Sequence, residues 1–88
     1  MITLEIEREH LARADRDIAQ GEARVAAQIE LVERLRSIGH GPGAAEALLA
    51  TMRQTLQAWR DHRDEILRII ERLERADRKP GAKRPQNP

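Results

Sequence analysis

One glycine-rich stretch of the sequence holds residue types that can do chemistry. Residues 39–43 read GHGPG, and a loop of this kind can cradle a phosphate or contribute to a metal site. A phosphate loop follows a strand and usually carries Lys with Ser or Thr, whereas here a long helical pattern precedes the loop and two alanines follow it. We therefore interpret it as a turn, in which Gly39 ends one helix, His40 or Gly41 caps the next, and Pro42 occupies its first turn.

The histidines outside this turn offer a second kind of chemistry. Glu7 and His10 form an E-x-x-H pair, the spacing used by di-metal carboxylate bundles. Glu71 and Glu74 have no matching histidine, so we expect a solvated surface pair and neither metal nor cofactor. His62, within RDHRDE, is a residue type suited to acid–base chemistry near neutral pH, but we expect no cleft beside it. The sequence leaves the roles of His10 and His62 open.

Nucleophiles are scarce in this chain. It has no cysteine, and its single serine, Ser37, adjoins the turn with no base aimed at it. We therefore predict that the protein is not an enzyme.

The composition is that of long helices. Among 88 residues, 35% are charged and Trp59 is the one aromatic residue, as is typical of coiled coils rather than of sandwiches or α/β folds. We find neither a signal-peptide core nor an apolar run of about 18 residues. We expect a cytoplasmic protein without membrane contact.

Apolar residues recur at every seventh position in the first half of the chain. This pattern predicts a helix over about residues 3–38, with Thr3 as its N-cap. One row is Leu4, Leu11, Ile18, Val25 and Val32, and the row three positions later includes Ala14, Gly21, Gln28 and Leu35. Intrahelical ion pairs are expected at Glu9–Arg13, Glu30–Arg34, Asp64–Arg68, Glu71–Arg75 and Glu74–Arg78.

The second half repeats this spacing and predicts a helix over about residues 43–77. Its first row is Ala45, Met52, Trp59, Ile66 and Leu73. We take the row three positions later as the second row of the seam: Leu48, Thr55, His62, Ile69 and Ala76. The adjoining Leu49, Leu56 and Ile70 widen the apolar face.

Together these patterns predict an all-α protein, an antiparallel two-helix coiled-coil hairpin over residues 1–78. Folding about residue 40 places Gly21 opposite Trp59. The glycine either makes room for the indole, which we favour, or marks a close approach between two chains. The expected seam comprises Leu11, Ile18, Gly21, Val25, Val32, Leu35, Leu48, Met52, Leu56, Trp59, His62, Ile66, Ile69, Ile70 and Leu73.

The apolar face is broader than two helices can cover. We therefore expect a homodimer that forms a four-helix bundle, with another helical protein as the alternative partner. Polar seam residues, Gln28, Thr55 and His62, are of the kind that sets register. The expected function is a non-enzymatic protein–protein interaction or self-assembly module.

The end of the chain differs in charge from the rest. Residues 1–77 hold 12 arginines against 15 acidic residues, whereas Arg78, Lys79, Lys83 and Arg84 face no acid. With three prolines, residues 79–88 are expected to be a disordered basic tail. An alternative function is a small dimeric nucleic-acid-associated or regulatory protein that uses this tail. We favour no nucleic-acid contact, because the helical arginines alternate with acids and stacking aromatics are lacking.

Residues 10–35 and 45–67 resemble a group of short bacterial proteins of unknown function. The shared elements are the His-Leu-Ala-Arg-Ala-Asp-Arg stretch at 10–16, Ile-Ala-Gln-Gly-Glu at 18–22, the glycine-containing break, and His-Arg-Asp-Glu-Ile-Leu at 62–67. The resemblance implies a helical hairpin and brings no activity, ligand or partner. It places His10, Gly21 and His62 in a recurring pattern.

Overall fold

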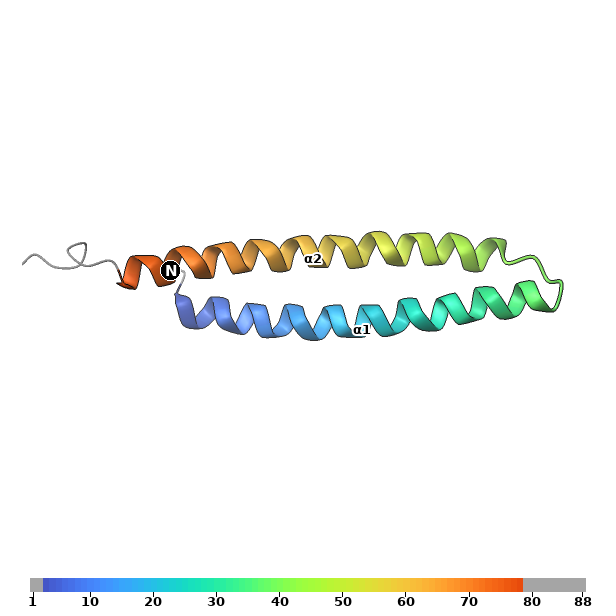
Figure 1. The fold of residues 1–88 in the computed structure, drawn as a ribbon, viewed down its shortest axis with the longest axis horizontal. Coiled ribbons are helices and arrows are strands. Elements are labelled where there is room, and N and C mark those ends of the chain that lie inside the picture. Colours follow the sequence, from blue (N-terminus) through green and yellow to red (C-terminus); the bar gives the residue numbers. More distant parts are fainter. Residues whose placement is uncertain (1–2, 79–88) are drawn as a thin grey trace, which may run out of the picture.

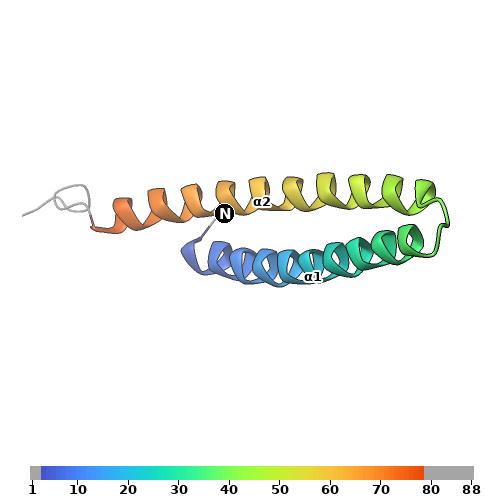
Figure 2. The same ribbon diagram turned by 45° about the vertical axis from the view of Figure 1, so that its right-hand side comes forward.

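The computed structural model describes residues 3–78, which form two long helices and no strand. Helix α1 (Leu4–Ser37) and helix α2 (Gly43–Arg78) run antiparallel and side by side (Figures 1 and 2). The expected all-α hairpin is confirmed, with helix bounds within one residue of those predicted. In this part of the chain, neither helix has an apolar stretch that would span a bilayer.

Thr3 starts α1 as its N-cap, as predicted. Its backbone is extended (φ −119°, ψ 157°), and its Oγ1 accepts a hydrogen bond of 3.1 Å from the Ile6 N–H. Glu5 and Glu7 lie in the first turn, where negative charge is favourable near the positive end of the helix dipole.

The glycine-rich segment is the connection between the helices. Gly39 has φ 74°, its N–H donates to the Arg36 carbonyl, and the His40 N–H donates to the Leu35 carbonyl. This pair of bonds is a Schellman motif, which needs a left-handed residue at the position of Gly39. The start of α2 differs from expectation, because the Glu46 N–H donates to the Pro42 carbonyl. Pro42 is therefore the N-cap, and the assignment of that role to His40 or Gly41 was wrong.

The best-packed part of the core lies toward the open end of the hairpin. Ala14, Ile66 and Ile70 form a buried cluster, against which Leu4 and Leu11 pack. The small Ala14 allows the two isoleucines of α2 to approach α1 closely, so burial here depends on matching small to large side chains.

One row of α2 was assigned wrongly from the sequence. Leu48 is 52% exposed and His62 is exposed, so these two residues do not face α1, whereas Ile69 of the same row is half-buried. The row one position later enters the seam, with Leu49, Leu56 and Ile70 buried and Arg63 half-buried. Both rows have heptad spacing, and the helix buries the one with three large aliphatic residues instead of two.

Candidate interaction surface

Ion pairs join α1 and α2 along one side of the hairpin. Their α1 members occupy a single heptad row, at positions 8, 15, 22 and 36. We call this side the ion-pair edge. Its pairs are Arg8–Glu74 at 3.0 Å, Arg60–Glu22 at 2.9 Å, Arg63–Asp15 and Arg36–Glu46.

These bridges replace the intrahelical pairs expected from the sequence. Glu74 binds Arg8 across the hairpin instead of Arg78, and none of the five i,i+4 pairs forms within residues 3–78. The hydrogen bond from Arg63 to Asp15, together with the charge of that carboxylate, raises the pKa of Arg63. The ion pair with Asp15 thus compensates the charge of Arg63, which lies in a row otherwise filled mainly by aliphatic residues.

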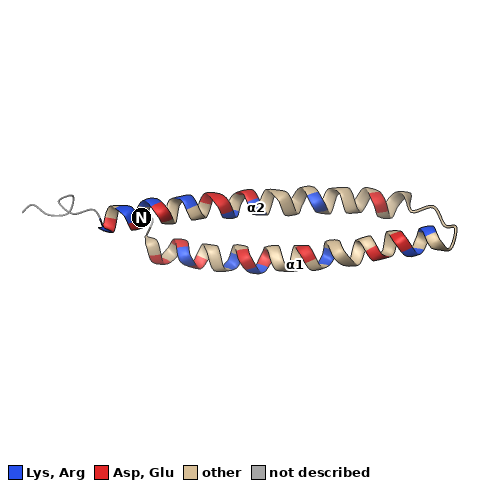
Figure 3. Cartoon of the chain, viewed as in Figure 1, with Lys and Arg blue, Asp and Glu red and all other residues tan. Residues whose placement is uncertain are grey.

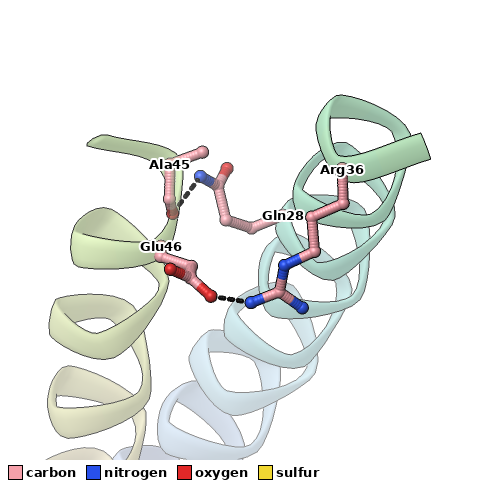
Figure 4. Close-up of polar contacts among 4 residues, drawn as sticks. All are labelled: Gln28, Arg36, Ala45 and Glu46. Carbon is pink, nitrogen blue, oxygen red and sulfur yellow. Dashed lines mark hydrogen bonds and ion pairs between the residues drawn. The ribbon is translucent and has the colours of Figure 1, made fainter. Parts of the chain in front are cut away.

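Two contacts tie the helices together beside the turn, and one of them belongs to the ion-pair edge (Figure 4). The Gln28 amide donates from Nε2 to the Ala45 carbonyl at 2.9 Å, and Arg36 reaches the Glu46 carboxylate. Gln28 lies in the seam, as its heptad position predicted. A long aliphatic residue there could not make this bond, so Gln28 specifies how the first turn of α2 sits against α1.

The opposite side of the hairpin, the open edge, has no interhelical ion pair among the described residues. Its α1 row contains His10, Asp17 and Arg24, and its α2 row contains Leu48, Thr55 and His62. A mainly apolar hollow of about 120 Å³ opens here. It is lined by Gly21, Arg24, Thr51, Met52, Thr55, Leu56 and Trp59.

Gly21 forms part of this hollow, against the Trp59 ring. A Cβ atom added to Gly21 would lie 3.1 Å from Leu56 Cδ1 and 3.2 Å from Trp59 Cζ3. The predicted pairing of Gly21 with Trp59 is therefore present. Trp59 is half-buried, so its ring fills the space over the glycine and also presents an apolar surface outward.

A second hollow of about 260 Å³ on the open edge brings two histidines together. It is lined by His10, Arg13, Ala14, Asp17 and His62. Sequence reasoning did not bring His10 and His62 to one hollow, because their positions relative to each other depend on the register of the two helices. Within residues 3–78 no three His, Cys, Asp or Glu side chains are grouped so as to hold a metal ion.

Glu7 is buried, contrary to the expectation of a solvated pair. It is 5% exposed, and its Oε2 lies 3.5 Å from His10 Nδ1. Glu7 occupies the α1 row that continues through Ala14 and Gly21, which faces α2. A carboxylate at such a position loses most of its hydration, and a single imidazole at this distance offsets little of that loss.

Charge is distributed unevenly along α2 (Figure 3). Residues 43–59 contain two charged side chains, Glu46 and Arg53, whereas residues 60–78 contain twelve. Glu46 belongs to the ion-pair edge, and Arg53 lies one heptad further along the same row. We call the open-edge side of residues 44–59, centred on the row of Leu48 and Thr55, the uncharged strip. Sequence reasoning missed it, although a count of charges by segment would have found it.

The basic residues of the expected tail, Lys79, Lys83 and Arg84, lie outside the described residues, whereas Arg78 is the last residue of α2. Comparison of the chain with models of known families, with curated proteins and with solved structures finds no match. The candidate site is therefore defined by geometry: a two-helix hairpin with one ion-paired edge and one open, partly apolar edge.

Proposed function

We propose that this protein is a non-enzymatic helical hairpin that associates with a second copy of itself and forms a four-helix bundle. The observation that carries the proposal is the shallow core: none of the side chains in residues 3–78 is fully buried. Two helices share only one contact surface, so their apolar residues remain partly in water. A second pair of helices would cover them, and closed two-fold association is the commonest way to supply one.

We propose that the protein has no catalytic role, because its single serine, Ser37, is not placed to act as a nucleophile. The Ser37 hydroxyl donates to the Arg34 carbonyl at 2.9 Å, so it serves the end of α1. A hydroxyl used in this way, without a base beside it, lacks the activation that nucleophilic catalysis requires.

Sedimentation equilibrium of the full chain tests the proposal. Across roughly 1–100 μM, we expect a mass that rises toward twice the chain mass of 10.1 kDa, with thermal stability that increases with concentration. A constant monomer mass over this range, combined with a cooperative melt, would contradict self-association. That result would leave a different helical protein as the molecule that covers the open edge.

A further inference from the structure

The open edge carries a protruding side chain of α2 and a hollow that α2 residues line for the most part. Leu48 is 52% exposed and is one of three exposed large apolar residues in the described chain, with Ile6 and Ile38. The hollow of about 120 Å³ is centred seven residues further along α2, around Thr55. This volume is close to the ~150 Å³ of a cavity that accepts benzene, so it is of the right size for one branched aliphatic side chain.

We propose that two copies associate in a staggered antiparallel dimer, in which Leu48 of each copy enters the Thr55-centred hollow of the other. The inference rests on the proposed self-association and specifies its surface and register. Leu48 and Thr55 lie seven residues apart in one heptad row. When two α2 helices pack antiparallel, Leu48 of each copy can therefore face Thr55 of the other copy at the same time. The two-fold axis then passes between Thr51 and Met52. A two-fold interface needs this self-complementarity, in which one patch contains both the protrusion and its receptor.

The distribution of charge favours this register over a fully overlapped bundle, in which the two antiparallel α2 helices are in contact along their whole length. In the staggered dimer, residues 44–59 of one α2 lie against residues 44–59 of the other, so the uncharged strip covers itself. In a fully overlapped bundle, the strip of each copy would instead face the open-edge side of residues 60–78 of the second copy, where Glu65 and Arg72 adjoin the row of His62, Ile69 and Ala76. Taking those charges out of water without partners would be costly.

The same register also accounts for the exposure of Ile38, the apolar residue beside the turn. Gly21 lies at the height of Leu56 and Trp59, so Ile38, seventeen residues further along α1, lies about level with residue 41. In the staggered dimer, residue 41 is opposite His62 of the second copy. Ile38, which is 71% exposed, would then approach the hollow lined by Ala14 and His62.

The size of the interface sets the expected affinity. The overlapping strip of residues 44–59 is about 24 Å long at 1.5 Å per residue. Since a helix is about 10 Å wide, a contact of this length buries well below the ~1,600 Å² of total surface in a standard stable interface. We therefore expect a dimer that dissociates at low micromolar concentration, and the experiments below use about 50 μM protein.

Cysteine cross-linking reports the register directly, because the chain has no cysteine of its own. Disulfide formation requires Cα atoms closer than about 7 Å. In the staggered dimer, Thr51→Cys places the two thiols beside the axis, whereas His62→Cys separates them by about 30 Å. In the fully overlapped bundle the thiols of His62→Cys lie beside the axis, and those of Thr51→Cys are about 30 Å apart. Ala50→Cys, on the side of α2 away from the open edge, is the matched control.

Under mild oxidation we expect most of the Thr51→Cys protein to become a covalent dimer, with little from the His62→Cys or Ala50→Cys protein. Predominant cross-linking of His62→Cys would overturn the register and leave the proposed dimer intact. A twofold mass with cross-linking of neither variant would overturn the choice of face. A monomeric mass would overturn both this inference and the self-association on which it rests.

A second pair of variants tests the protruding leucine. Leu48→Glu places a carboxylate in the apolar hollow of the second copy, so we expect the dimer dissociation constant to increase at least tenfold. Ala50→Glu introduces the same charge on the other side of α2 and should change it less than twofold. Leu48 is largely exposed in the hairpin, so circular dichroism should show that both variants keep their helices. Equal dissociation constants for the two variants would contradict the proposal.

Discussion

The ring of Trp59 lies so close to Gly21 that a single added carbon would be 3.2 Å from its Cζ3 atom. A glycine in the middle of a helix costs about 1 kcal/mol relative to alanine. Introducing a methyl group where neighbouring side chains leave too little room for it costs about 1–3 kcal/mol. Since Leu56 Cδ1 would also be 3.1 Å away, we expect overpacking to exceed the gain in helix propensity. The prediction is that Gly21→Ala lowers the free energy of unfolding by about 1 kcal/mol.

A double-mutant cycle separates this contact from general effects of the substitution. Trp59→Ala alone should cost about 2–3 kcal/mol, at the low end for a large aromatic residue because the ring is half-buried. In that background Gly21→Ala should become more favourable by about 1 kcal/mol, because the ring no longer opposes the methyl group. Urea unfolding at one protein concentration measures all four proteins. A coupling near zero would show that Gly21 is not retained for the indole.

Glu7 is predicted to destabilise the hairpin. The residue is 5% exposed, and its Oε2 lies 3.5 Å from His10 Nδ1. Replacing a poorly compensated buried charge by an apolar side chain of similar size is often stabilising by 1–4 kcal/mol. We expect Glu7→Met to raise the free energy of unfolding by about 1 kcal/mol or more.

Glu5 provides the control for Glu7. It lies in the same first turn and is exposed, so Glu5→Met removes the favourable interaction with the helix dipole without removing a buried charge. That variant should lose about 0.3–1 kcal/mol. If chemical denaturation shows that both methionine variants are destabilised alike, the burial of Glu7 has no energetic consequence.

The two helices and their turn could be predicted because their determinants are local. Seven-residue spacing identified the α1 seam, Thr3 has a side chain that caps a helix, and Gly39 is a residue type that adopts φ 74° without strain. The pairing of Gly21 with Trp59 followed from chain length, since a short turn leaves few registers for an antiparallel hairpin.

The errors arose where two alternatives had similar local patterns. Leu48 and Leu49 both belong to heptad rows of α2, and only packing against α1 decides which row is buried. Arg63 was overlooked as a seam residue because its charge suggests exposure, whereas its bond to Asp15 across the hairpin holds it there. Glu74 likewise has a partner within reach on its own helix, and the structure pairs it with Arg8 instead. Contacts between the helices cannot be read from intrahelical spacing alone.

Removing the N-cap should weaken α1 at its first turn. The Thr3 hydroxyl accepts from the Ile6 N–H at 3.1 Å, and loss of such a cap typically costs about 1 kcal/mol. We expect Thr3→Ala to show this loss in thermal unfolding, whereas Thr3→Ser, which keeps the hydroxyl, should stay within about 0.5 kcal/mol of the parent. Equal stability of the alanine and serine variants would mean that the cap contributes nothing.

The bond between Gln28 and the Ala45 carbonyl should make the amide at position 28 difficult to replace by an acid. Gln28 is part-buried, and its Nε2 donates at 2.9 Å. In Gln28→Glu, a carboxylate would face the carbonyl oxygen, so the bond would be lost and two acceptors would be left close together in a partly dry seam. We expect a loss of about 1–3 kcal/mol. Gln20→Glu makes the same chemical change at an exposed position of α1 and should stay within about 0.5 kcal/mol of the parent. Similar urea midpoints for the two variants would show that Gln28 does not hold the start of α2 against α1.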